Sequence, residues 1–256
     1  MKVDALLLDI DGVLVVGDQT VPGAPEAIRW LIDQGIPYRY ISNSTQRSRK
    51  EIAERLRKAG VTISIDQLQT PVVAALSLLE EEGITTCRLL MTESARSEFL
   101  DAGITDTGEG VDAVIIGDAG EGFTYQVLNA AFREIHDGAL PIALERDRYW
   151  MAADGLSLAA GPFVAALEYA TGKTARILGK PSPDAFRAAC SQMGSSPGST
   201  AMIGDDIRSD VGGAQDAGLL GVLVQTGKYT DRVLEESGIQ PDMILPSIAD
   251  LRALFV

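Results

Sequence analysis

Two aspartates separated by one residue follow an apolar run near the start of the chain. Residues 5–8 read ALLL, and Asp9, Ile10, Asp11 and Gly12 come directly after them. Side chains alternate along an extended strand, so residues two positions apart can face the same ligand. Two such carboxylates can take separate roles in one reaction, one as nucleophile and the other as acid and base, because a carboxylate consumed as a nucleophile cannot also transfer protons. The other interpretation of such a pair is a solvated turn.

Polar side chains also follow three later apolar runs that have the character of strands. Ser42 follows YRYI, Lys180 follows ARILG, and Asp205 follows TAMIG. Apolar runs that alternate with helical patterns predict βαβ units and a parallel sheet, whose chemistry lies at the carboxyl ends of the strands. We therefore expect these three side chains to lie with Asp9 at one edge. Two acids, a hydroxyl and an ammonium suit phosphate chemistry with Mg²⁺, because carboxylates hold this cation through oxygen while the other groups contact the phosphoryl oxygens.

Each of these residues also has a purely structural interpretation. Ser42 and Asn43 could cap the helix that follows them. The turn around Lys180 could carry an ordinary surface lysine. Asp206 and Asp210 could be acids near a helix N-terminus, where the helix dipole favours them.

In this order, the residues resemble the motifs of the haloacid dehalogenase-like (HAD) hydrolase superfamily. Its opening DxDG motif matches Asp9 to Val13, its second motif matches Ser42, its third matches Lys180, and its GDxxxxD motif matches residues 204–210. The stretches GKPSP, MIGDDIRSDVGGAQDAG and QTGKY are similar to the capped subclass IIA. This branch includes phospholysine phosphohistidine inorganic pyrophosphate phosphatase. Ser42 stands where Thr is more common in the branch, which keeps the hydroxyl group.

The resemblance implies a division of work between the first two aspartates. Asp9 is expected to attack phosphorus and to form an aspartyl phosphate. Asp11 is expected to protonate the leaving group as general acid and then to activate water as general base. Asp9, the backbone carbonyl of Asp11, and Asp205 are expected to bind Mg²⁺.

The resemblance also implies supporting roles for five further residues. Ser42, Asn43 and Lys180 are expected to bind the phosphate. Asp206 and Asp210 are expected to add a metal ligand through water or to orient one.

The spacing of the motifs locates a second domain. Well over a hundred residues separate Ser42 from Lys180, and a structureless loop of that length is implausible in a compact protein. Alternating helical and strand patterns fill the interval. We predict a doubly wound, parallel-sheet α/β core of the Rossmann-like HAD type in residues 1–71 and 175–256, with an α/β cap domain inserted at residues 72–174. In the resembling subclass such a cap lies over the active site and limits substrate size.

One segment of the expected cap domain is rich in charged and aromatic side chains. Residues 143–155 read ALERDRYWMAADG. Arg146, Arg148 or Tyr149 is a candidate contact for the leaving group of the substrate. A surface hairpin is the other interpretation of the segment.

The composition limits the partners and the compartment. The chain has 256 residues, a formal net charge of −14 and a pI near 4.5. This charge argues against a nucleic acid or a membrane surface as partner, because both attract clustered Lys and Arg. No apolar run is long enough to cross a bilayer, and no secretory signal is visible at the start. Cys87 and Cys190 are isolated, which is typical of free thiols in a reducing compartment, so we expect a cytoplasmic protein.

Together these features predict a Mg²⁺-dependent phosphatase that forms an aspartyl phosphate. The expected substrate is a small phosphate monoester, phosphoramidate or pyrophosphate. The alternative is a non-catalytic or receiver-like phosphate-binding protein on the same fold. Whether the chain forms a homodimer stays open.

Overall fold

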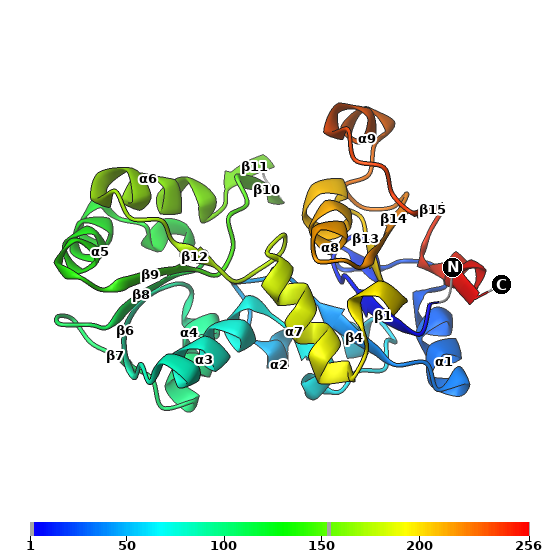
Figure 1. Cartoon of the computed structure of the whole chain (residues 1–256), viewed down its shortest axis with the longest axis horizontal. Helices are drawn as coiled ribbons and strands as arrows, with labels where there is room; N and C mark the ends of the chain where they lie inside the picture. Colours follow the sequence, from blue (N-terminus) through cyan, green and yellow to red (C-terminus); the bar gives the residue numbers. More distant parts are fainter. Residues whose placement is uncertain (1–2, 153–154, 256) are drawn as a thin grey trace. The chain divides into compact units, whose positions relative to one another are not determined.

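The computed structural model describes residues 3–152 and 155–255, and the chain forms two compact units (Figure 1). The core unit comprises Met1–Ser42, Arg49–Gln69 and Lys180–Val256, and the inserted unit comprises Asn43–Ser48 and Thr70–Gly179. Each unit has its own parallel sheet and its own hydrophobic core.

Six parallel strands form the sheet of the core unit, in the order β15-β14-β13-β1-β4-β5. Their bounds are β1 (Ala5–Leu8), β4 (Tyr38–Ile41), β5 (Leu68–Gln69), β13 (Thr200–Gly204), β14 (Leu220–Val224) and β15 (Met243–Leu245). The chain moves from β1 to β4 and β5 on one side, and then to β13, β14 and β15 on the other. The order therefore reverses between β1 and β13, which is where an open α/β sheet binds its ligand. The doubly wound parallel sheet expected from the sequence is confirmed.

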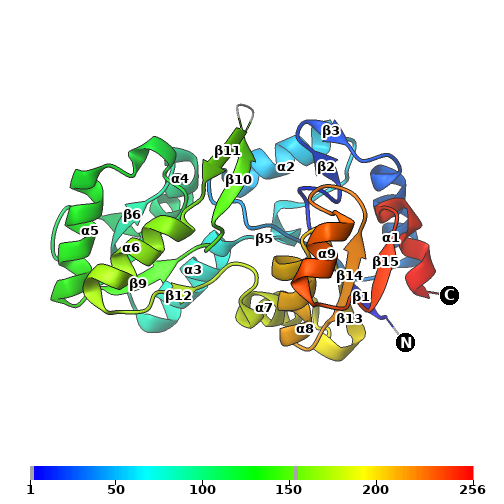
Figure 2. The same cartoon turned by 90° about the horizontal axis from the view of Figure 1, so that it is seen from above.

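Helices cover both faces of this sheet because β1 is apolar on both sides (Figure 2). Leu6 and Leu8 pack with residues of α1 and α2, whereas Leu7 packs with residues of α7 and α8. The helices of the core unit are α1 (Ala24–Gln34), α2 (Arg49–Lys58), α7 (Pro183–Met193), α8 (Gly213–Asp216) and α9 (Asp231–Ser237). Shorter or irregular helices are η1 (Ile65–Gln67), η3 (Pro197–Ser199), η4 (Ile207–Gly212) and η5 (Ile248–Phe255), and a small hairpin pairs β2 (Val15–Val16) with β3 (Gln19–Thr20).

The inserted unit is also an α/β layer structure. Its five parallel strands have the order β12-β9-β8-β6-β7. They are β6 (Thr86–Leu90), β7 (Thr105–Asp106), β8 (Ala113–Ile116), β9 (Leu140–Ala143) and β12 (Arg176–Ile177). The helices are α3 (Pro71–Glu82), α4 (Glu93–Asp101), η2 (Gly120–Gly122), α5 (Tyr125–Asp137) and α6 (Gly161–Thr171).

The inserted unit extends beyond residues 72–174. Residues 175–179 lie with it, because β12 pairs with β9 instead of forming the expected core strand before the third motif. A strand of two residues carries too little pattern to show which sheet it joins, since pairing is a long-range contact. Residues 43–48 also belong to this unit, where the Asp118 backbone N–H donates to the Thr45 hydroxyl at 3.0 Å.

The charged and aromatic segment of the inserted unit contains a hairpin. β10 (Tyr149–Ala152) and β11 (Gly155–Leu158) pair antiparallel. Tyr149 is exposed, and Arg146 forms an ion pair with Glu168 at 2.7 Å. These contacts fit the surface-hairpin interpretation, and a contact with a leaving group stays a prediction.

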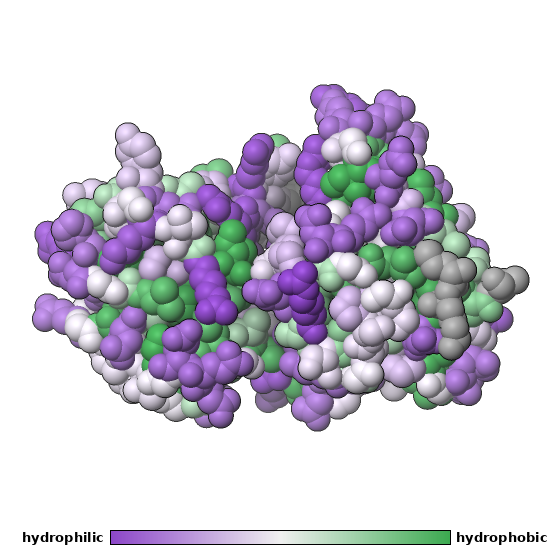
Figure 3. Space-filling view, in the orientation of Figure 1, coloured by the Kyte–Doolittle hydropathy of each residue, from purple (hydrophilic) through white to green (hydrophobic). Residues whose placement is uncertain are grey.

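The structure shows where charged residues and the two cysteines of the chain lie. Figure 3 shows hydrophilic side chains over much of one face, including α9, in which no residue is buried. Among the described helices, none combines the length and the apolar character that a bilayer span requires. Cys87 and Cys190 are both buried and unbridged.

Candidate active site

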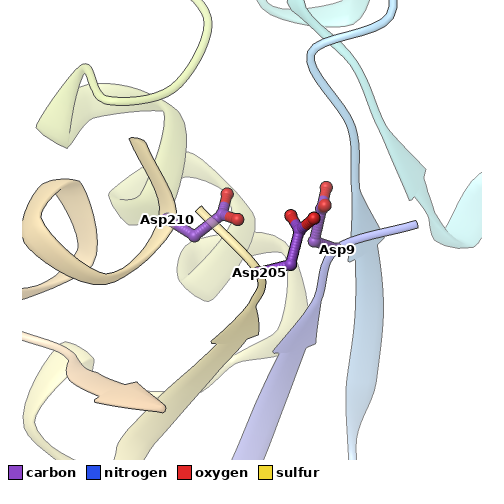
Figure 4. A group of neighbouring side chains, drawn as sticks. All are labelled: Asp9, Asp205 and Asp210. Atoms are coloured by element: carbon purple, nitrogen blue, oxygen red, sulfur yellow. The ribbon is translucent and has the colours of Figure 1, made fainter. Parts of the chain in front are cut away.

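Two aspartates lie at the strand reversal of the core sheet. Asp9 follows β1 and Asp205 follows β13, and the Asp9 backbone N–H donates to the Ile203 carbonyl at 2.9 Å. These neighbouring strands are parallel, so both carboxylates come from the same edge. Asp210, from η4, points into the same space (Figure 4). All three side chains are buried, and each offers a carboxylate oxygen within 4.8 Å of the others.

The Lys180 ammonium lies within this group of carboxylates. Its Nζ is 2.6 Å from Asp9 Oδ1 and 2.6 Å from Asp210 Oδ1. The Lys180 side chain is only 4% exposed. Burial opposes the charged form, but the charges of Asp210 and Asp9 outweigh it and raise the pKa of Lys180. The lysine is therefore a fixed positive charge.

One ammonium does not balance three buried carboxylates. Burial is the main cause that raises the pKa of Asp9, and the charges of Asp210 and Asp205 add to it against the opposing effect of Lys180. Burial and then the charge of Asp210 raise the pKa of Asp205 to about 7. The excess negative charge and the all-oxygen donor set fit a hard divalent cation. Asp9, Asp205 and Asp210 can therefore hold a metal ion.

Two glycines make room for the Asp205 carboxylate. Gly12 has φ +89°, and a Cβ there would lie 1.9 Å from Asp205 Oδ2. Gly227 has φ +63°, and a Cβ there would lie 2.0 Å from the same oxygen and 2.5 Å from Gly12 Cα. The Lys228 backbone N–H donates to Asp205 Oδ2 at 2.7 Å, and the Thr226 hydroxyl donates to the Gly12 carbonyl. The chain after β14 thus fixes the direction of Asp205.

Residues 226–228 were missed as site residues in the sequence, although QTGKY is one of the stretches that carry the resemblance. The signal was present, because this loop follows a buried strand of the same parallel sheet. The rule that selects Asp9 and Asp205 from their strand ends also selects this loop. It was overlooked because its contacts are made by a glycine, a backbone N–H and one threonine hydroxyl, and none of these is a charged group or a metal ligand.

The two acids after Asp205 lie in different surroundings. Asp206 caps η4, since its Oδ1 accepts from the N–H groups of Arg208 at 3.0 Å and Ser209 at 3.1 Å. Burial opposes its ionisation, but Lys228 and the two N–H groups lower the pKa of Asp206. Asp210 instead joins the buried carboxylates. Asp206 therefore has the capping role that the sequence left open, whereas Asp210 lies at the candidate metal site.

Asp11 lies apart from the three buried carboxylates. In the described residues it is not a member of their group, and its side chain is 57% exposed. Its Oδ1 accepts a hydrogen bond from Arg55 Nη1 at 2.8 Å. Arg55 belongs to α2 and had no chemical signature in the sequence.

The residues of the second motif divide between the units. Ser42 is buried at the end of β4, one strand from β1, and its N–H donates to the Gln69 carbonyl at 3.0 Å. It therefore shares the sheet edge with Asp9. Asn43 groups with the inserted unit, where its Oδ1 lies close to Gly179. A role of Asn43 in phosphate binding stays a prediction.

Comparison with known proteins agrees with this arrangement. Residues 6–105 match the family model of haloacid dehalogenase-like hydrolases, and residues 177–251 match a second model described as HAD-hydrolase-like. The chain is 45% identical to haloacid dehalogenase-like hydrolase domain-containing protein 2 of Pongo abelii, over 93% of this chain and 89% of that protein. It is 37% identical to phospholysine phosphohistidine inorganic pyrophosphate phosphatase of Rattus norvegicus, over 97% of this chain and 92% of that protein. The solved structure of 4-nitrophenylphosphatase from Thermotoga maritima superposes with a TM-score of 0.92 at 26% identity, over 98% of this chain and 97% of that one. The resemblance seen in the motifs is confirmed, and the chain belongs to the haloacid dehalogenase-like hydrolase family.

Proposed function

We propose that this chain is a Mg²⁺-dependent phosphatase that hydrolyses a small phosphorylated molecule through an aspartyl phosphate. The observation that carries the proposal is the buried group of Asp9, Asp205 and Asp210 around the Lys180 ammonium. Relatives that are named phosphatases support it. Phosphate monoesters, phosphoramidates and pyrophosphate are the substrate classes to test, and the names of these relatives include examples of each class.

A divalent cation would balance the excess negative charge of the site. Asp9, Asp205 and Asp210 would hold it, and the family resemblance adds the backbone carbonyl of Asp11 as a ligand. Oxygen ligands alone suit Mg²⁺ better than a metal that prefers sulfur or nitrogen. When bound, the ion would supply charge neutralisation for the phosphoryl group.

The side chains of the core unit account for both chemical steps. Asp9 attacks phosphorus, so that a bond forms to its carboxylate oxygen while the bond to the leaving oxygen breaks. Lys180 holds one oxygen of Asp9, and with the Ser42 hydroxyl it donates to the phosphoryl oxygens. Asp11 gives a proton to the leaving oxygen. In the second step Asp11 takes a proton from water, which attacks the aspartyl phosphate and releases phosphate and Asp9.

We further propose that the inserted unit is the cap that limits substrate size. We assign to this cap the residues of the compact unit, Asn43–Ser48 and Thr70–Gly179, in place of residues 72–174. The net charge of −14 supports a small phosphorylated substrate over nucleic acid or a membrane surface. The proposal also keeps the cytoplasmic location that the sequence predicts. A homodimer is one candidate oligomeric state.

The separate roles of Asp9 and Asp11 provide the test. The variants are Asp9→Asn, Asp11→Asn and the control Asp33→Asn, which changes an exposed aspartate on α1. p-Nitrophenyl phosphate and Mg²⁺ are mixed rapidly with enzyme, and mass spectrometry after an acid quench locates added phosphoryl groups. We expect phosphoenzyme to accumulate in Asp11→Asn and to be absent from Asp9→Asn. Both variants should lose at least ~10²-fold in turnover, the low end of what a positioned acid or base contributes.

Three outcomes would contradict the proposal. One is turnover of Asp9→Asn within tenfold of wild type. Another is a phosphoryl group on Asp11 or Ser42. The third is full wild-type activity in the presence of EDTA, because EDTA chelates the metal that the proposal requires. Binding of phosphate without turnover would instead favour the receiver-like alternative.

A further inference from the structure

We propose that Arg55 is a positioning residue that fixes the direction of the Asp11 side chain for proton transfer. The proposal rests on the proposed function, in which Asp11 is the general acid and base. Arg55 does not need to touch the substrate, because it acts through Asp11.

The Arg55 guanidinium joins Asp11 to the small hairpin that follows it. Its Nη1 donates to Asp11 Oδ1 at 2.8 Å, and its Nη2 donates to the Gly17 carbonyl. Asp11 lies just before β2 and forms a bridge with Val15, whereas Gly17 lies in the turn between β2 and β3. One planar group therefore holds the side chain and the hairpin tip together.

The base of the Arg55 side chain is rigid. Its helix, α2, buries Ile52, Ala53 and Leu56 in the main core of the core unit, and Val15 of the hairpin is in the same cluster. The Arg55 side chain is only 19% exposed, compared with 57% for Asp11. An exposed aspartate without a partner moves among several rotamers. Arg55 offers Asp11 a fixed donor, and its two-pronged geometry is one that lysine cannot reproduce.

This arrangement has the logic of an oriented acid or base. A group that transfers protons needs correct direction as well as correct reach, and a third residue commonly supplies the direction. Arg55 occupies Oδ1 of Asp11. Within the described residues no hydrogen bond is made to Oδ2, so this oxygen can carry the proton.

The proposal predicts a dependence on the leaving group. A p-nitrophenolate leaves with little protonation, whereas a phenolate needs the acid more. Misdirecting Asp11 should therefore slow phosphoryl transfer from phenyl phosphate more than from p-nitrophenyl phosphate. A purely structural role of Arg55 would slow both substrates equally.

The experiment measures kcat/KM for both substrates with Mg²⁺. The variants are Arg55→Ala, Arg55→Lys and the control Lys58→Ala, which changes an exposed residue of the same helix. For Arg55→Ala we expect a loss of about 10-fold on phenyl phosphate, a part of what acid–base catalysis contributes, and less than about 3-fold on p-nitrophenyl phosphate. Arg55→Lys should lie between wild type and Arg55→Ala, and Lys58→Ala should match wild type.

Asp11→Asn provides the background in which the effect must vanish. Adding Arg55→Ala to Asp11→Asn should leave the ratio of the two kcat/KM values unchanged, because no acid remains to be directed. Equal losses on both substrates, no loss, or a ratio that still changes in the Asp11→Asn background would overturn the proposal. If Arg55→Ala does not fold, the ratio for Arg55→Lys decides. A wild-type enzyme that hydrolyses neither substrate would instead refute the proposed function, and this inference would fall with it.

Discussion

Replacing Lys180 by methionine tests the charge balance of the site. The ammonium lies 2.6 Å from both Asp9 and Asp210 and is almost fully buried. Methionine is similar in length and flexible, so the apolar stem keeps its packing while the charge is lost. Three buried carboxylates then have no cation between them unless a metal is bound.

The structure sets the size and the pH dependence of the expected loss. Removing one partner of a buried ion pair costs about 3–5 kcal/mol of folding free energy, because an uncompensated charge remains. The buried acids can limit this cost by taking up protons, since the pKa of Asp9 and that of Asp205 are raised already. Without Lys180 the folded state binds more protons than the unfolded state near neutral pH, so stability falls as pH rises. We expect about 3–5 kcal/mol at pH 8 and a smaller loss at pH 5.

Urea unfolding in EDTA at both pH values measures this loss. The control is Lys228→Met, because Lys228 also pairs with an aspartate, Asp206, at 3.2 Å but is 62% exposed. An exposed pair contributes at most about 1 kcal/mol. A loss for Lys180→Met no larger than that of the control, or a loss greater at pH 5 than at pH 8, would refute the reasoning. Added Mg²⁺ should restore part of the stability, since it binds the folded state.

Two other substitutions probe the packing of Asp205 and a buried acid of the inserted unit. Gly227→Ala would place a Cβ 2.0 Å from Asp205 Oδ2, so kcat/KM should fall about 10²-fold, as for a displaced catalytic group. The control Gly35→Ala also changes a glycine with a positive φ, at +64°, but nothing lies within 4 Å of the added Cβ, so an equal fall in both variants would contradict this explanation. Burial raises the pKa of Glu145 from 4.5 to about 7. The folded state therefore keeps the Glu145 proton to a higher pH than the unfolded state does. The free energy of unfolding should then fall by ~3 kcal/mol as pH rises from about 4.5 through about 7. Glu145→Gln cannot ionise, so its thermal midpoint should fall less between pH 5 and 8 than that of wild type, whereas the exposed Glu81→Gln should leave this slope unchanged.

The strand-end rule explains which parts of the site could be predicted. Asp9, Ser42 and Asp205 each follow a buried strand of the core sheet, and a parallel sheet brings such ends to one edge. Lys180 was selected by the same rule for an incorrect reason, because β12 belongs to the other sheet. Lys180 instead lies between β12 and α7, at the point where the chain returns to the core unit.

Contacts between elements distant in sequence could not be predicted in this way. Arg55 is one of several basic residues on α2. Its position next to Leu56 predicts only that it lies beside the buried face of the helix. Its pairing with Asp11 depends on where the hairpin of β2 and β3 lies against the helix. Local patterns carry no information on such a contact, which is why the sequence identified Asp11 but not the group that holds it.

The GDxxxxD motif shows how local and distant effects combine at the site. Gly204 has no side chain, and a Cβ there would lie 2.2 Å from Asp210 Cβ, so only glycine lets η4 approach the strand end so closely. Asp206 caps η4, and the Val211 N–H bonds to the Asp206 carbonyl five residues earlier, which widens the first turn. A widened turn changes the direction of the next side chains compared with an ordinary helix. The two acids that follow Asp205 therefore serve different purposes: Asp206 begins η4, and Asp210 reaches the buried ammonium of Lys180.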